Sequence, residues 1–196
     1  MTAPDPARRA GRRQFLLVAS LFFVPVVTAI LLYYSSVWRP AVNSQGTLID
    51  PPRMLTAAGL TLADGRPAPV NVFEGQWSVV HPAAACDERT EALLEELGRV
   101  RLALDKDAPR VRRVLLHAGG CEAVVLPSRD ADLLVLDASG AGDEALLAAF
   151  PPAADGAPGI YIVDPHGNLM MSYPASGAAR GLLKDLERLL RLSNIG

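Results

Sequence analysis

The most apolar stretch of the chain lies near its N-terminus and predicts a membrane-spanning helix. The 20 residues from Phe15 to Tyr34 contain no charged side chain. As a helix they would span about 30 Å, the thickness of a bilayer's hydrocarbon core, and Pro25 in the middle predicts a kink. We therefore assign residues 14–38 to a transmembrane helix that follows a basic segment, residues 1–13.

Charged and aromatic residues at the two ends of this stretch predict its orientation. Basic residues stay on the cytoplasmic side, and aromatic residues gather at the membrane interfaces. Four arginines precede the stretch and three aromatic residues close it: Arg8, Arg9, Arg12 and Arg13, then Tyr33, Tyr34 and Trp38. We expect a single-pass protein of a bacterial inner membrane, with its N-terminus in the cytoplasm and residues 39–196 in the periplasm. A cleaved signal peptide or a twin-arginine export signal is the alternative interpretation.

The pattern changes twice beyond the apolar stretch. Residues 39–69 are polar and contain five prolines, which break regular structure, so we expect a linker with one short strand near Leu60. From residue 70 onward, short apolar runs alternate with segments of helical periodicity. The expected elements are strands at 77–81, 111–116, 133–136, 159–163 and 169–173, and helices at 87–104, 143–150 and 177–192.

This alternation predicts the fold. Strands that alternate with helices form parallel sheets with right-handed crossovers. The turn at 164–168 should join the last two strands as a hairpin. Residues 70–196 are therefore expected to form an α/β domain, a thioredoxin-like mixed sheet flanked by helices and preceded by a single transmembrane helix.

Composition narrows the possible functions. The 196 residues carry 19 Lys and Arg against 21 Asp and Glu, a net charge of -2, and 50% of them are hydrophobic. A chain this apolar is not disordered, and its charge gives no electrostatic basis for binding nucleic acid. With only two cysteines, the chain cannot build a four-cysteine zinc or iron–sulfur site.

Several segments resemble a family of membrane-anchored thioredoxin-like proteins. The strongest is YIVDPHGNLMMSYP at 161–174, and residues 46–52, 99–107 and 181–186 add to it. The chain thereby resembles the proteobacterial relatives of the Sco/SenC copper chaperones, which are associated with cytochrome c oxidase assembly. The resemblance covers most of the chain. It implies a thioredoxin-like fold, integral association with the membrane, and respiratory oxidase assembly proteins as partners.

The sequence departs from this family at the metal site. Sco-type proteins bind copper with a Cys-x-x-x-Cys motif after the first core strand and a histidine in a later loop. Here Cys86 matches the first cysteine, but Thr90 occupies the second position. The loop directly before Tyr161, PPAADGAPGI at 151–160, contains no histidine, and His166 lies beyond that strand. Two of the three copper ligands are missing, so no cofactor is firmly implied, although copper is possible.

Cys86 is the candidate catalytic residue. It lies where a strand gives way to a helix, and a helix N-terminus lowers the pKa of a thiol. The neighbouring acidic residues Asp87, Glu88 and Glu91 oppose this effect, because negative charge disfavours a thiolate. Cys86 is thus either a reactive or metal-binding thiol, or a thiol with no partner.

Cys121 follows the next core strand, so both cysteines are expected at one edge of the sheet. They are a disulfide candidate if their Cα atoms lie within about 7 Å; the alternative is two separate thiols. His81 and His117 precede the two cysteines at the same strand ends. The four residues therefore also form a candidate site for Zn(II) or Cu(I), against the alternative of ordinary loop histidines.

Two further features have both a structural and a functional interpretation. Pro158 precedes the fourth core strand, where thioredoxin-like folds often place a cis-proline, and its isomer stays open. A group of arginines would face either solvent or an anionic lipid or acidic partner. Its members are Arg99, Arg101, Arg110, Arg112 and Arg113.

These observations lead to three functional hypotheses. From the family resemblance, the first is a membrane-anchored periplasmic accessory factor in cytochrome c oxidase assembly, which acts by protein–protein contact and is not an enzyme. The second is a thiol–disulfide oxidoreductase, in which Cys86 attacks and Cys121 resolves the mixed disulfide. The third is a metal carrier that uses both cysteines and both histidines.

Overall fold

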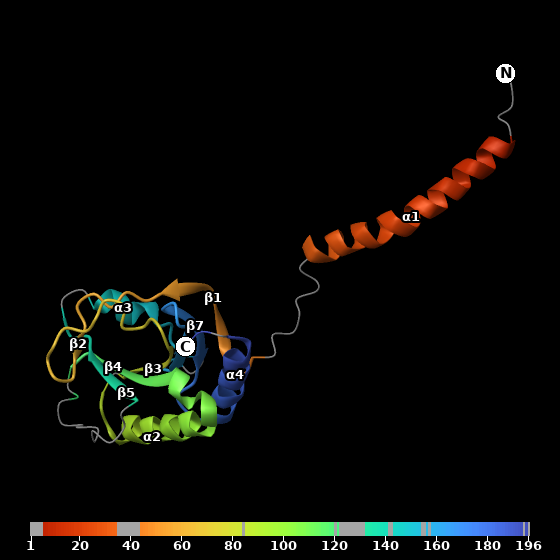
Figure 1. Cartoon of the computed structure of the whole chain (residues 1–196). Helices are drawn as coiled ribbons and strands as arrows, with labels where there is room; N and C mark the ends of the chain where they lie inside the picture. The colour runs from red at the N-terminus through yellow and green to blue at the C-terminus, as the bar shows by residue number, and fades with distance from the viewer. Residues whose placement is uncertain are drawn as a thin grey trace. The chain divides into compact units, whose positions relative to one another are not determined.

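The computed structural model of the chain contains an N-terminal helical unit and a compact α/β unit, Met1–Asn43 and Ser44–Gly196. The described residues are 6–34, 44–83, 85–119, 121, 132–140, 143–153, 156, 158–193 and 195. In the first unit, α1 (Pro6–Tyr34) continues through Pro25 (Figure 1). Its segment Phe15–Leu32 has a mean hydropathy of 2.7 and no buried residue, so α1 is long and apolar enough to cross a membrane. Trp38 and the side chains of the flanking arginines and Tyr33 lie outside the described residues.

The second unit is built on a seven-stranded mixed sheet with the strand order β1-β7-β6-β3-β4-β5-β2. The strands β3, β4 and β5 are parallel, and the other pairings are antiparallel. The predicted thioredoxin-like α/β fold is confirmed. The strands are β1 (Thr47–Met54), β2 (Thr61–Leu62), β3 (Trp77–Ala83), β4 (Val111–His117), β5 (Leu133–Asp137), β6 (Ile160–Val163) and β7 (Asn168–Tyr173). The helices are α2 (Glu88–Ala103), α3 (Glu144–Ala149) and α4 (Ala179–Leu192), with a 3-10 helix η1 (Asp105–Arg110) after α2.

Hydrophobic clusters cover both faces of the sheet. On one face Val79 and Ile162 pack with Leu97 of α2 and Leu186 of α4. On the other, the neighbouring residue Val80 belongs to a cluster that contains α3. Because successive strand residues point to opposite faces, strands buried on both sides become continuous apolar runs. Such runs are the feature that made β3, β4 and β6 recognisable in the sequence.

The start of the compact unit differs from the sequence expectation. Residues 39–69 were expected to be a linker, but the unit begins at Ser44, and β1 and β2 join the two edges of its sheet. The prolines in β1 lie where its pairing with β7 shifts register, between Leu48 and Arg53. Proline is tolerated on an edge strand or at a bulge, so proline content was a misleading criterion here.

Candidate functional site

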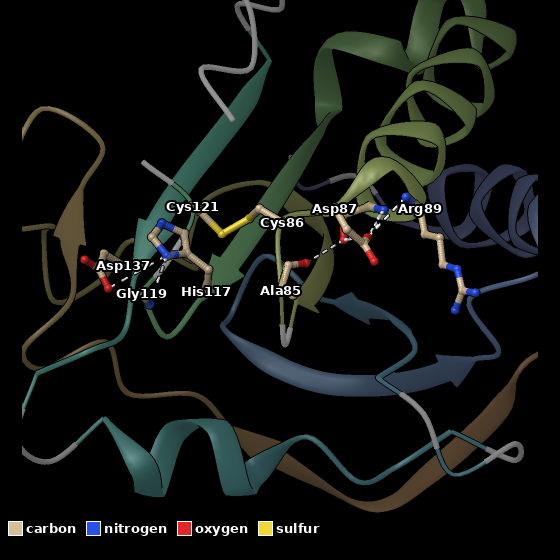
Figure 2. The surroundings of a disulfide bond; sticks show 9 residues. Ala85, Cys86, Asp87, Arg89, His117, Gly119, Cys121 and Asp137 are labelled. Carbon is tan, nitrogen blue, oxygen red and sulfur yellow. Dashed lines mark hydrogen bonds and ion pairs between the residues drawn. A yellow bond between two sulfur atoms is a disulfide. The ribbon is translucent and has the colours of Figure 1, made fainter. Parts of the chain in front are cut away.

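Cys86 and Cys121 form a disulfide just beyond the ends of the two central parallel strands (Figure 2). Ala83 of β3 pairs with His117 of β4, so the two parallel strands end side by side, and the residues after them leave the sheet at the same edge, the one formed by the carboxyl ends of the strands. The Cα atoms of the two cysteines are 5.1 Å apart, a normal spacing for a disulfide. Cys121 is buried and Cys86 is half-buried, so Cys86 is the more accessible residue of the two.

The residue after Cys86 occupies the N-terminus of α2. Asp87 is the N-cap: its Oδ1 accepts hydrogen bonds from the backbone N–H groups of Arg89 at 3.1 Å and Thr90 at 3.0 Å. The bond from Thr90 is the main cause that lowers the pKa of Asp87. These N–H groups are the ones that would stabilise a thiolate at a helix N-terminus. The carboxylate of Asp87 therefore competes with Cys86 for the favourable end of the helix.

Thr90 stands where the family pattern places a second cysteine, and its side chain has a structural role. It is buried, and its hydroxyl donates to the carbonyl of Ala85 at 2.8 Å. The same hydroxyl lies 3.3 Å from Asp87 Oδ1. Thr90 thus fastens the loop that carries Cys86 to the first turn of α2, and it brings no sulfur ligand to the site.

The two histidines have separate partners. His81 Nδ1 donates to the carbonyl of Gly159 at 2.9 Å, at the start of β6, and burial lowers the pKa of His81 although this bond opposes the change. His117 Nδ1 accepts from the N–H of Gly119 at 3.3 Å and lies 3.9 Å from Asp137 Oδ1.

The structure therefore brings the two cysteines together without assembling the four-residue metal site. Among the described residues, no group of three or more His, Cys, Asp and Glu side chains is placed to hold a metal ion. Both sulfurs are committed to the disulfide, and His81 is committed to a carbonyl on the neighbouring strand. That carbonyl contact joins residues 78 positions apart, so the histidine spacing in the sequence gave no sign of it.

A mostly apolar cavity of about 320 Å³ opens at the same edge of the sheet. Ala83 lines it from the end of β3, Ala118 from the end of β4, Phe150 from the end of α3, and Pro158 from the residues before β6. Ala83 and Ala118 each lie three positions before one of the bonded cysteines. The isomer of the bond before Pro158 involves Ala157, which lies outside the described residues. The cavity is therefore an apolar recess, and two of its lining residues lie close in sequence to the cysteines of the disulfide.

The fold agrees with the comparison against protein families. Residues 77–193 match the family described as transmembrane-like, thioredoxin-like, C-terminal domain. This match covers more than half of the chain, and the protein belongs to that family. Comparison with curated proteins finds no match.

Solved structures of Sco proteins have the same fold. Bradyrhizobium japonicum ScoI with copper bound is 18% identical, with a TM-score of 0.52 over 70% of this chain and 98% of that one. Arabidopsis thaliana ScoI with copper bound is 14% identical, with a TM-score of 0.54 over 76% and 99%. Yeast Sco1 with copper bound is 12% identical, with a TM-score of 0.55 over 76% and 94%. The resemblance stated from the sequence is thereby confirmed at the level of the fold.

Proposed function

We propose that this protein is a membrane-anchored accessory factor in cytochrome c oxidase assembly. The helix α1 holds it in a bacterial inner membrane, and its thioredoxin-like domain works in the periplasm. It acts by contact with partner proteins and not as an enzyme. Tethering both partners to one membrane raises their effective concentration, so a modest contact surface suffices.

The observation that carries this proposal is a Sco-like fold with an incomplete copper site. The domain shares the fold of proteins solved with copper bound. At its own strand ends, Thr90 is bonded to the loop backbone, and Cys86 is closed in a disulfide. A copper carrier needs open soft ligands that take up and release the metal. A domain that keeps the fold without those ligands fits a role in which the surface is recognised.

The cavity beside Ala83 and Ala118 supports such recognition. Its wall is mainly apolar, and it includes the aromatic side chains of Phe150 and Tyr161. Buried aromatic and aliphatic pockets are where partner side chains contribute most to protein–protein affinity. We place the contact with the assembly partner at this edge of the sheet.

Deletion of the gene in the bacterium that encodes it tests this function. Cytochrome c oxidase activity and its haem absorbance in isolated membranes should fall and should be restored by the wild-type gene. The Cys86→Ser/Cys121→Ser double variant should also restore them, provided that it accumulates, whereas a variant without residues 6–34 should not. Oxidase activity that is unchanged by the deletion would reject the proposal.

The disulfide favours one second candidate, a thiol–disulfide oxidoreductase. In its reduced form the Cys86 thiolate would attack a partner's disulfide and release one partner sulfur as a thiol. The Cys121 thiolate would then attack Cys86 Sγ, which forms the observed bond and releases the second partner thiol. Insulin reduction by the protein in the presence of dithiothreitol, lost in Cys86→Ser, would establish this activity. In that case the double variant would also fail to restore the oxidase.

A further inference from the structure

A second cavity, of about 470 Å³, lies at the opposite ends of the central strands from the disulfide. Val111 and Arg112 line it from the start of β4, and Leu133 from the start of β5. Gln76 stands immediately before β3, and Arg101 comes from the last turn of α2. Neither the oxidase proposal nor the disulfide makes use of this cavity.

The cavity has a half-buried cation, Arg112, that pairs with no carboxylate in the part of the chain that the structure describes. Arg112 Nε donates to Ser78 Oγ at 2.8 Å, and the same guanidinium donates to the carbonyl of Val72. No ion pair to Arg112 occurs among the described residues. Burial lowers the pKa of Arg112, which reflects the cost of holding this charge away from water. An anion in the cavity would offset that cost.

The one carboxylate among the lining residues already serves two other arginines. Asp132 accepts a two-pronged interaction from Arg113, at 2.7 and 3.1 Å, and lies 3.3 Å from Arg101 Nε. Asp132 thus pairs with Arg101 and Arg113, and within the described residues it forms no ion pair with Arg112, the third guanidinium at this end of the sheet. Arg112 and Arg101 both line the cavity, and of these two only Arg101 has an ion pair to Asp132.

We propose that this cavity is a binding site for an organic phosphate, presented either as a free phosphate ester or as a phospholipid headgroup. A guanidinium matches the geometry of phosphate oxygens and pairs with them in a two-pronged manner. The volume is larger than a bare ion requires and falls in the range of small-molecule sites, roughly 300–1,000 Å³. The amide of Gln76 also lines the cavity, and its Nε2 donates to the carbonyl of Pro109 at 3.1 Å.

The test uses the full-length protein in nanodiscs of uncharged phosphatidylcholine. Glycerol 3-phosphate is titrated while heat release and the midpoint of thermal unfolding are recorded. A second arm replaces part of the lipid by phosphatidylglycerol and adds no phosphate ester. We expect saturable binding in the first arm, a raised midpoint in the second, or both. Effect in the first arm alone identifies a soluble ligand, and effect in the second arm alone identifies a headgroup.

Variants distinguish binding in this cavity from non-specific electrostatic attraction. Arg112→Gln should weaken binding at least tenfold, but it also disturbs the hydrogen bonds to Ser78 and Val72. Gln76→Glu leaves the bonds of Arg112 in place and adds a negative charge to the cavity lining at the cost of the bond to Pro109, and it should weaken binding as strongly. Arg99→Gln removes an exposed cation of α2 that pairs only loosely with Glu95, and it should change nothing. No effect in either arm, or equal binding by the wild type and both cavity variants, would overturn the proposal.

Discussion

The hydroxyl of Tyr173 donates a hydrogen bond of 2.9 Å to Asp185, which joins the last strand of the sheet to its last helix. The same carboxylate oxygen accepts from the backbone N–H groups of Gln45 at 2.7 Å and Gly46 at 3.0 Å. Burial and the neighbouring carboxylate both raise the pKa of Tyr173. One buried carboxylate, 3% exposed, therefore fastens the entry of the chain into the compact unit to α4.

Replacement of this carboxylate should destabilise the domain. Asp185→Asn leaves two backbone donors with a weaker acceptor, and hydrogen bonds to a charged group contribute about 1.5–3 kcal/mol each. We expect the free energy of unfolding to fall by about 2–4 kcal/mol, and Tyr173→Phe to cost about half as much. Urea unfolding followed by circular dichroism measures both. Glu187→Gln, at an exposed position of the same helix, is the matched control and should change stability by less than about 0.5 kcal/mol.

His81 should make the domain less stable in mild acid. Its pKa in the folded state is lowered by burial from the ordinary value of 6.5. The unfolded chain therefore binds the proton more readily, so the contribution is fully present above about pH 6.5 and is lost as the pH falls below it. The urea midpoint of the wild type should fall between pH 7.5 and 5.5, and His81→Gln should lose most of this dependence. His166→Gln, in an exposed turn, should keep it; equal behaviour of the two variants would contradict the assignment.

The regular elements of the domain were predictable because their cause is local. The apolar period of Leu93, Leu97 and Val100 predicted α2, and these residues are buried in the structure. Continuous apolar runs predicted the central strands for the same reason. By contrast, β1 has only one buried residue, Ile49, because it lies at the edge of the sheet. Its existence depends on pairing with the distant strand β7, as in Thr47 with Ser172, and no local sequence pattern indicates that pairing.

The candidate site was likewise only partly predictable from the sequence. Parallel strands bring their ends to one edge, so the proximity of Cys86 and Cys121 could be inferred from the element order. The partners of the histidines could not, because Gly159 offers His81 a backbone carbonyl that any residue would supply. The environment of Arg112 was equally hidden. The sequence shows a group of arginines, but only the fold shows which of them pair with the carboxylate of Asp132.

Asp132 should contribute to stability in a pH-dependent manner. Burial alone would raise its pKa, but hydrogen bonds and charge from Arg113, together with the charge of Arg101, lower it below the ordinary value of 3.8. The contribution is therefore present above about pH 4 and is lost as the pH falls through the lowered value. Asp132→Asn removes the negative charge that pairs with the guanidinium of Arg113, which is 3% exposed.

We expect this substitution to cost about 3 kcal/mol at pH 7, since loss of one partner of a buried ion pair is strongly destabilising. The difference between the wild type and Asp132→Asn should become smaller as the pH falls from 5 to 3, because the wild type then loses the contribution of the ionised carboxylate. Urea unfolding at pH 7, 5 and 3 measures the difference. A constant difference between the two proteins at all three values would show that the loss is one of packing and not of charge.

The disulfide should be a major source of stability whichever function the protein has. It links residues 35 positions apart, and closing a loop of that length in the unfolded chain amounts to about 3–4 kcal/mol in the loop-entropy description. For a domain of this size that corresponds to a thermal midpoint lower by about 10 °C. Differential scanning calorimetry of the wild type with and without dithiothreitol measures the shift. The Cys86→Ser/Cys121→Ser double variant should melt like the reduced wild type and should be insensitive to the reductant. If the wild type melts identically in both conditions, the bond does not stabilise the fold, and its retention would then favour the oxidoreductase candidate over a structural role.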